Sequence, residues 1–223
     1  MAIVTDSATA LMRELRAEVR QHNKSGRLIL AVDGRDGAGK TTFADSLGAV
    51  FAGAGDEVYR ASLDDFHRPK LERYARGRTS PEGFYRDSYD EEQFRRLLIE
   101  PFRRGSGAFR LSAFDLDADV PVEAPEHEAG PDAVLIVDGL FLHRPELRGI
   151  WNWSVWLHVP AAIAFARMAE RDGTDPDPDA ESNVRYRQGN AIYARDADPR
   201  STASAIIDNS YPETPQRIFG DFC

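Results

Sequence analysis

Short apolar runs alternate along the chain with segments in which apolar residues recur every three or four positions. The apolar runs predict strands at 28–32, 57–63, 133–137, 155–159 and 205–207, and the alternating segment 108–115 predicts another. The periodic segments predict helices at 8–22, 43–51, 90–99, with Pro101 beyond its end, and 161–171. Strands that alternate with helices predict an α/β protein with a doubly wound, mostly parallel sheet of about five strands and helices on both faces.

A glycine-rich turn, Gly34-Arg35-Asp36-Gly37-Ala38-Gly39-Lys40-Thr41, directly follows the first apolar run. It matches G-x-x-x-x-G-K-[ST] between a strand and a helix, the phosphate-binding P-loop, which predicts the P-loop NTPase fold. Backbone N–H groups of such a loop surround phosphate oxygens, so glycines stand where a Cβ would strike the ligand. We expect nucleotide contacts from Gly34, Asp36, Gly37, Ala38, Gly39, Lys40, Thr41 and Thr42. The alternative is a chance match, which a chain of this length meets about 1% of the time.

Three aspartates follow predicted strands on the rim where ligands of open parallel sheets bind. Asp138 ends the 133–137 run and suits Mg²⁺ binding together with the Thr41 hydroxyl. Asp64 follows the second strand and suits the general base that accepts a proton from an attacking hydroxyl. The alternative for Asp64 is a turn or N-cap residue, and we prefer that alternative for Asp65.

Arginines late in the chain predict a helical lid over about 167–190. Arg167 and Arg171 share one face of the predicted helix, while Arg185 and Arg187 follow a proline-containing loop. Such a lid would stabilise charge on a transferred phosphate and exclude water, with Lys40, Arg167 and Arg171 as catalytic cations. Which of the four arginines contacts the phosphates stays open, and surface pairing of Arg167 is the alternative.

Composition narrows the class of protein. The 223 residues carry a net charge of −9, which argues against nucleic-acid binding. No apolar stretch approaches the roughly 18 residues that span a membrane. The N-terminus lacks the layout of a signal peptide, and the single cysteine, Cys223, favours a reducing, cytoplasmic setting. We expect one domain over 1–223, with the lid and a substrate-facing excursion at about 64–90.

Five stretches share the patterns of one family: 34–42, 62–69, 83–90, 137–139 and 167–172. With them the chain resembles the uridine kinase family of P-loop kinases, which includes phosphoribulokinase and bacterial pantothenate kinase, over about residues 27–209. The resemblance implies an ATP- and Mg²⁺-dependent phosphotransferase in which Asp64 is the base for a ribose 5′-hydroxyl. It also implies that Arg167 and Arg171 belong to the lid and that Asn209 lies beside the adenine.

The acceptor site implied by the resemblance comprises Asp64, His67, Arg86, Phe114 and Asp115. Two departures fall at this site, because His67 replaces a tyrosine and Asp119 stands where the family has a histidine of the nucleobase pocket. We expect a small-molecule hydroxyl acceptor, with a pyrimidine nucleoside first and pantothenate, nicotinamide riboside or a sugar phosphate as alternatives. A non-catalytic nucleotide-gated binding module and a homo-oligomer also stay open.

Overall fold

A six-stranded sheet forms the centre of the structure, a computed structural model that describes residues 6–105 and 107–219. In the order of the sheet the strands are β10 (Gln216–Ile218), β9 (Ala205–Asp208), β8 (Trp153–His158), β1 (Leu28–Gly34), β7 (Val134–Gly139) and β2 (Val58–Ser62). Five are parallel, as the apolar runs predict, and β10 pairs antiparallel with β9. The mostly parallel α/β fold is therefore confirmed. Cys223 lies outside the described residues.

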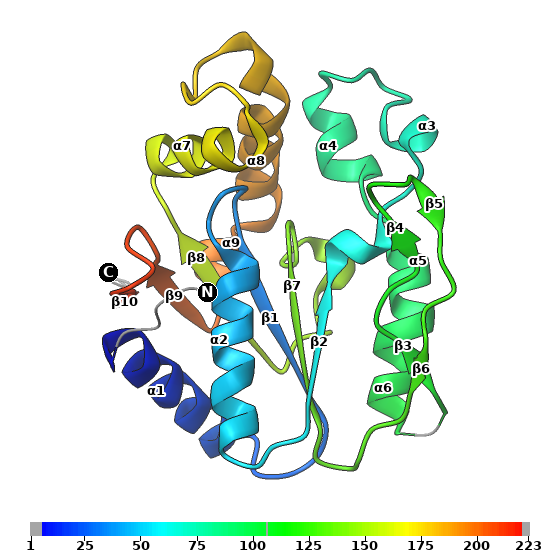
Figure 1. Cartoon of the computed structure of the whole chain (residues 1–223), viewed down its shortest axis with the longest axis vertical. Helices are drawn as coiled ribbons and strands as arrows, with labels where there is room; N and C mark the ends of the chain where they lie inside the picture. The colour runs from blue at the N-terminus through cyan, green and yellow to red at the C-terminus, as the bar shows by residue number, and fades with distance from the viewer. Residues whose placement is uncertain (1–5, 106, 220–223) are drawn as a thin grey trace.

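Helices cover both faces of the sheet (Figure 1). The chain's helices are α1 (Asp6–His22), α2 (Lys40–Gly53), α3 (Lys70–Arg73), α4 (Pro81–Asp87), α5 (Glu91–Phe94), α6 (Glu100–Arg104), α7 (Ala161–Asp172), α8 (Val184–Ala197) and α9 (Pro199–Thr202). Because side chains of a strand alternate between faces, Leu28 and Leu30 of β1 pack in one core cluster with α1 and α2. Ile29 and Ala31 pack in the other cluster, with residues of α4, α5, α6 and α8.

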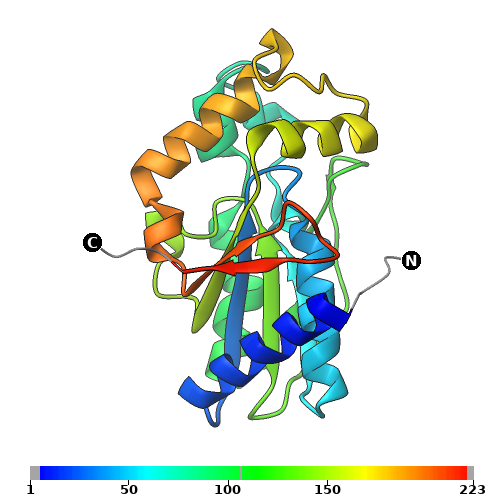
Figure 2. The same cartoon turned by 90° about the vertical axis from the view of Figure 1, so that its left-hand side faces the viewer.

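The strand register brings the three predicted rim positions together. Asp138 of β7 pairs with Val32 of β1 on one side and with Ser62 of β2 on the other. The P-loop, the turn after β2 and the end of β7 therefore meet at one edge of the sheet. Helices α7 and α8 lie above this edge (Figure 2), where the sequence predicts the lid.

Two details of the predicted elements were wrong. Segment 108–115 is not a strand of the main sheet, because β3 (Phe109–Arg110) and β4 (Phe114–Asp115) pair with β6 (Glu126–His127) and β5 (Val120–Pro121) in separate two-stranded ribbons. The helix expected to stop before Pro101 continues through a π-helical turn at Arg95–Ile99 into α6, since a wider turn accommodates the missing proline N–H. The excursion contains the short helices η1 (Leu63–Phe66), α3 and α4.

Within residues 6–105 and 107–219, no helix combines the length and the hydropathy that a bilayer crossing requires.

Candidate active site

The P-loop has the backbone geometry that its glycines predict. Gly37 and Gly39 have φ values of +71° and +83°, which lie in the left-handed region that favours glycine. A Cβ on Gly37 would lie 2.2 Å from the carbonyl oxygen of Ala164, and one on Gly39 would lie 3.0 Å from Nδ2 of Asn209. The nearest neighbours of these two positions are therefore parts of α7 and of the segment after β9. The glycines are therefore required by the close packing of the protein around the loop, in addition to the space that a bound phosphate needs.

Side chains on either side brace the loop. Asn209 is buried and donates from Nδ2 to the carbonyl oxygen of Ala38 at 2.7 Å. Lys40 reaches back across the loop, and its Nζ donates to the carbonyl oxygen of Arg35 at 3.1 Å. The Lys40 ammonium thus lies on the inner side of the turn, where the motif needs it.

Thr41 and Asp138 are in direct contact. The Thr41 hydroxyl donates to Oδ2 of Asp138 at 2.8 Å, while the Arg60 guanidinium holds Oδ1 at 2.8 Å. A hydroxyl beside a carboxylate offers the hard oxygen ligands that Mg²⁺ prefers, so these two residues fit the ion. Across the described part of the chain, no cluster of three His, Cys, Asp or Glu side chains is arranged to hold a metal. An ion bound here needs nucleotide phosphates and water as its other ligands.

Tyr89 orients Asp64, a contact that the spacing of residues in the sequence does not indicate. The hydroxyl of Tyr89, which is 1% exposed, donates to Oδ1 of the exposed Asp64 at 2.9 Å. Burial raises the pKa of Asp36 in the P-loop. The Lys40 ammonium lowers this pKa, and the Asp64 carboxylate raises it. Tyr89 lies in the 83–90 stretch, but only the fold shows which hydroxyl reaches Asp64.

Asp65 belongs to the same acidic group. Burial raises the pKa of its carboxyl, and the carboxylates of Asp64 and Asp138 raise it further. Asp64 and Asp65 both lie in the first turn of η1. Three carboxylates thus share the rim beside Thr41, a concentration of negative charge that a cation would relieve.

The four arginines that the sequence predicts for a lid have different surroundings. The Arg171 guanidinium pairs with Asp172, and the pKa of Arg171 is raised first by that bond and then by the carboxylates of Asp36 and Asp64. Arg185 donates to the carbonyls of Arg78 and Ser80, and Arg187 pairs with Asp179.

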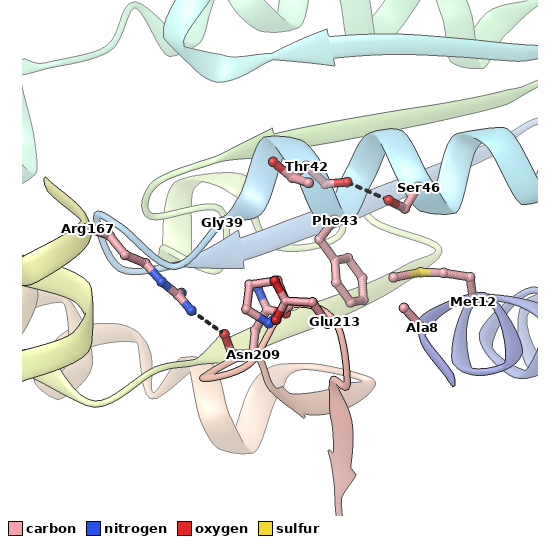
Figure 3. Close-up of a pocket in the computed structure, with 10 residues that line it drawn as sticks. Ala8, Met12, Gly39, Thr42, Phe43, Ser46, Arg167, Asn209 and Glu213 are labelled. Carbon is pink, nitrogen blue, oxygen red and sulfur yellow. Dashed lines mark hydrogen bonds between the residues drawn. The ribbon is translucent and has the colours of Figure 1, made fainter. Parts of the chain in front are cut away.

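Arg167 lines a pocket of about 510 Å³ beside the P-loop (Figure 3). The other residues that line it are Ala8, Met12, Gly39, Thr42, Phe43, Ser46, Asn209, Pro212 and Glu213. Arg167 donates to the carbonyls of Gly37, Asn209 and Ser210, at 3.3, 3.1 and 2.9 Å. It therefore ties α7 to the P-loop and to the segment after β9. The size of the pocket and its position next to Gly39 suit the base of a bound nucleotide.

The predicted acceptor residues do not all reach Asp64. His67 does, because its Nδ1 lies 2.7 Å from the Asp64 carbonyl oxygen and its ring packs on Tyr89. Phe114 is buried, and Asp115 accepts hydrogen bonds from the N–H groups of its own turn. Arg86 pairs with Glu82 and Asp196, two carboxylates of α4 and α8.

Asp119 holds the excursion together. Its carboxylate accepts from the Lys70 N–H at 3.0 Å and from the buried Arg73 guanidinium at 2.9 Å. Asp119 also has a φ of +57°, which for a non-glycine residue marks a constrained turn. The residue that replaces the family's histidine thus fastens the β4–β5 ribbon to α3.

A mostly parallel sheet with helices on both faces, in which β1 runs into a P-loop and then a helix, is the architecture of the P-loop NTPases. No protein-family model matches the sequence. Among solved structures, the chain is similar to a "possible uridine kinase" from Bacillus stearothermophilus, with a TM-score of 0.70 and 21% identity over 89% of this chain and 96% of that one. It is also similar to a "putative fructose transport system kinase" from Silicibacter sp. TM1040, with a TM-score of 0.62 and 27% identity over 88% and 94%.

A third similar structure is the D-glycerate 3-kinase of Cryptococcus neoformans var. grubii, with a TM-score of 0.60 and 12% identity over 96% of this chain and 99% of that one. These likenesses show that the chain has the P-loop kinase fold. They also support the resemblance to the uridine kinase group that the sequence stretches indicate.

Proposed function

We propose that this chain is a kinase that transfers the γ-phosphate of ATP to a primary hydroxyl of a small metabolite. The observation that carries the proposal is the position of Asp64 in the turn after β2, at the sheet edge where the P-loop also lies, with the Tyr89 hydroxyl bonded to its carboxylate. A carboxylate beside the end of a phosphate-binding loop can accept the proton of an attacking alcohol. Over residues 1–223 we treat the chain as one kinase domain with a lid at about 167–190 and an excursion at about 64–90.

The Asp64 carboxylate is suited to the role of base because its two oxygens have different tasks. Burial raises the pKa of Tyr89 well above its usual value, so the phenol stays protonated and donates to Oδ1. We assign the other oxygen, Oδ2, to the acceptor hydroxyl, from which it takes the proton as the oxygen attacks phosphorus. The fixed orientation reduces the freedom that the base loses when the acceptor binds.

The residues that would hold ATP and Mg²⁺ follow from the same geometry. Loop N–H groups and Lys40 would bind the phosphates, Thr41 and Asp138 the ion, and the pocket beside Arg167 the adenine. When bound, Mg²⁺ neutralises charge on the β- and γ-phosphates. Arg171, at the end of α7, would add positive charge over the transferred group.

The acceptor that we place first is a pyrimidine nucleoside phosphorylated at its 5′-hydroxyl. The similarity to the structure described as a possible uridine kinase supports this choice. Asp119 stands where the resemblance places a histidine of the nucleobase pocket, but its carboxylate already accepts hydrogen bonds from Arg73 and Lys70. Other alcohols are therefore worth testing as acceptors. Pantothenate, nicotinamide riboside and sugar phosphates are the alternatives from sequence, and glycerate and fructose join them from the similar structures.

An acceptor panel tests the proposal. ADP release from ATP and Mg²⁺ is measured with uridine, cytidine, pantothenate, nicotinamide riboside, D-glycerate, fructose and ribulose 5-phosphate, with Asp64→Asn protein as the matched control. We expect one acceptor class to accelerate ADP release in the wild type, and uridine or cytidine to do so most strongly. Tight ATP binding without transfer to any acceptor would instead favour the nucleotide-gated binding module.

A further inference from the structure

The carboxylate of Asp33, the residue before the P-loop, is completely buried and joins three separate parts of the fold. Its Oδ1 accepts from the N–H of Gly34 at 2.7 Å. Its Oδ2 accepts from the N–H and from Nδ1 of His143, at 3.1 and 2.7 Å, and from the hydroxyl of Tyr193 on α8. The start of the P-loop, the segment after β7 and the lid helix α8 thus share one carboxylate.

The donor and the acceptor of each hydrogen bond in this cluster can be assigned. A carboxylate only accepts, so every group bonded to Asp33 is a donor, one on Oδ1 and three on Oδ2. The His143 N–H is shared, because it also donates to the Tyr193 hydroxyl oxygen at 2.9 Å. His143 then carries its proton on Nδ1, and its Nε2 accepts from the Ser154 hydroxyl at 2.9 Å. Burial raises the pKa of Tyr193 well above its usual value, so its hydroxyl remains a donor.

Ser154, His143 and Asp33 follow the hydrogen-bond order of a hydrolytic triad, but the cluster cannot act as one. The three residues are 5%, 2% and 0% exposed, so a substrate cannot reach the serine hydroxyl. A buried hydrogen-bond network of this kind fixes the relative position of the elements that contribute to it.

A second hydrogen bond connects the same face of α8 to the P-loop. Asn190 lies three residues before Tyr193, so the two side chains share one face of the helix. The Asn190 Nδ2 donates to Oδ2 of Asp36 at 3.1 Å and to the Tyr186 carbonyl, although its buried Oδ1 lacks a partner within the described residues. The amide orientation follows from its two acceptors, because an oxygen turned toward Asp36 would be repelled.

The other side of α8 is also fixed. A Cβ on Gly189 would lie 2.6 Å from the Phe84 ring and 3.2 Å from the carbonyl oxygen of Pro81, so α8 packs closely on α4. The ring of Tyr193 packs on Phe141, whose φ of +66° is unusual for an aromatic residue. The C-terminal half of α8 therefore has little freedom to move as part of an opening lid.

We propose that Asn190 and Tyr193 are positioning residues that make α8 a clasp on the P-loop. The clasp holds the loop at Asp33, before its first glycine, and at Asp36, within it. By this inference α8 sets the shape of the phosphate cradle before nucleotide binds, and only the part of the lid that precedes the clasp moves. The inference rests on the proposed function only in assuming that the P-loop binds a nucleotide.

The test compares Tyr193→Phe with Tyr85→Phe, which removes a hydroxyl from the same aromatic cluster but one that does not bond to Asp33. Amide hydrogen exchange of residues 34–40 is measured in the nucleotide-free protein, and affinity is measured with a fluorescent N-methylanthraniloyl ATP and Mg²⁺. We expect Tyr193→Phe to accelerate exchange and to weaken nucleotide binding, each by about tenfold relative to Tyr85→Phe. Asn190→Ala should accelerate exchange of the same amides.

Two outcomes would overturn the clasp. One is equal exchange of residues 34–40 in Tyr193→Phe and Tyr85→Phe at matched global stability. The other is a uniform rise in exchange over the whole chain, which is the signature of a purely structural role. A wild type that binds the fluorescent nucleotide but phosphorylates no acceptor would refute the proposed function alone, because exchange and affinity test the clasp without catalysis.

Discussion

The buried hydroxyl of Tyr89 donates a 2.9 Å hydrogen bond to Oδ1 of the exposed Asp64. The donor comes from the end of the excursion and the acceptor from the turn after β2, so the bond closes the excursion onto the rim of the sheet. Tyr89 also packs its ring on His67, which an antiparallel bridge joins to it. The orientation of the proposed base is therefore a property of the folded excursion.

Asp64→Asn should reduce kcat at least about a hundredfold and leave the KM for ATP nearly unchanged, because the amide cannot accept the proton. Tyr89→Phe should reduce kcat by about tenfold, since the base remains but is no longer oriented. Steady-state kinetics with the best acceptor measure both effects, with Asp65→Asn as the neighbouring carboxylate control. Unchanged turnover in Asp64→Asn would contradict the assignment of the base.

Arg60→Met should raise the Mg²⁺ concentration for half-maximal activity about tenfold. The reason is that Arg60 orients the Asp138 carboxylate by donating to its Oδ1. The matched control is Asp45→Asn, which removes the other ion pair of Arg60, at 3.0 Å with Asp45 largely exposed. Titration of activity with Mg²⁺ compares the two variants. An equal change in both would show that Arg60 acts through general stability.

Gly37→Ala should lower the free energy of unfolding by about 2–4 kcal/mol, because it adds a clash with Ala164 to left-handed backbone strain. Gly26→Ala separates the two causes, since Gly26 has a φ of +88° and no atom within 4 Å of an added Cβ. That control should lose only about 1–2 kcal/mol. Urea denaturation measures both, and equal losses would mean that contact with α7 does not matter.

Ser46→Trp should raise the KM for ATP about tenfold with kcat within about twofold, because it fills the pocket where we place the adenine. Ala49→Trp is the control, an exposed position on the same helix outside that pocket. A loss of kcat without a change in KM would place the adenine elsewhere.

The pKa of Asp36 is raised above its usual value of 3.8, chiefly by burial, which gives stability a defined pH dependence. The folded state binds this proton more tightly than the unfolded state does. Protonated Asp36 therefore stabilises the fold below about pH 3.8, and this stabilisation is lost as pH rises through the raised pKa. Asp36→Asn cannot ionise. Its stability relative to the wild type should therefore increase from acid to neutral pH.

Urea unfolding of both proteins between pH 3.5 and 7 measures this difference. Asp172→Asn provides the opposite sign, because the hydrogen bond from Arg171 lowers the pKa of Asp172. A wild type that gains stability relative to Asp36→Asn as pH rises would contradict the prediction.

The sequence by itself determined the features that depend on neighbouring residues. Each apolar run of β1, β2, β7, β8 and β9 is short, and each helix between them has an apolar face, which sufficed to predict the parallel sheet. The P-loop was also readable, because its glycines, Lys40 and Thr41 must stand at fixed spacing on one turn. The rule that ligands bind where parallel strands end predicted that Asp138 lies on the same rim as the P-loop. The structure adds that Thr41 and Asp138 are in contact.

Only the tertiary structure decided which distant side chains touch. Three hydrogen bonds at the site join residues far apart in sequence. They run from Tyr89 to Asp64, from Asn190 to Asp36 and from Tyr193 to Asp33. Local patterns also missed the π-helical turn at Arg95–Ile99 and the separate ribbons formed by 108–115. The physical reason is that periodicity records which face of an element is buried, whereas hydrogen-bond partners across elements are fixed by how those faces pack.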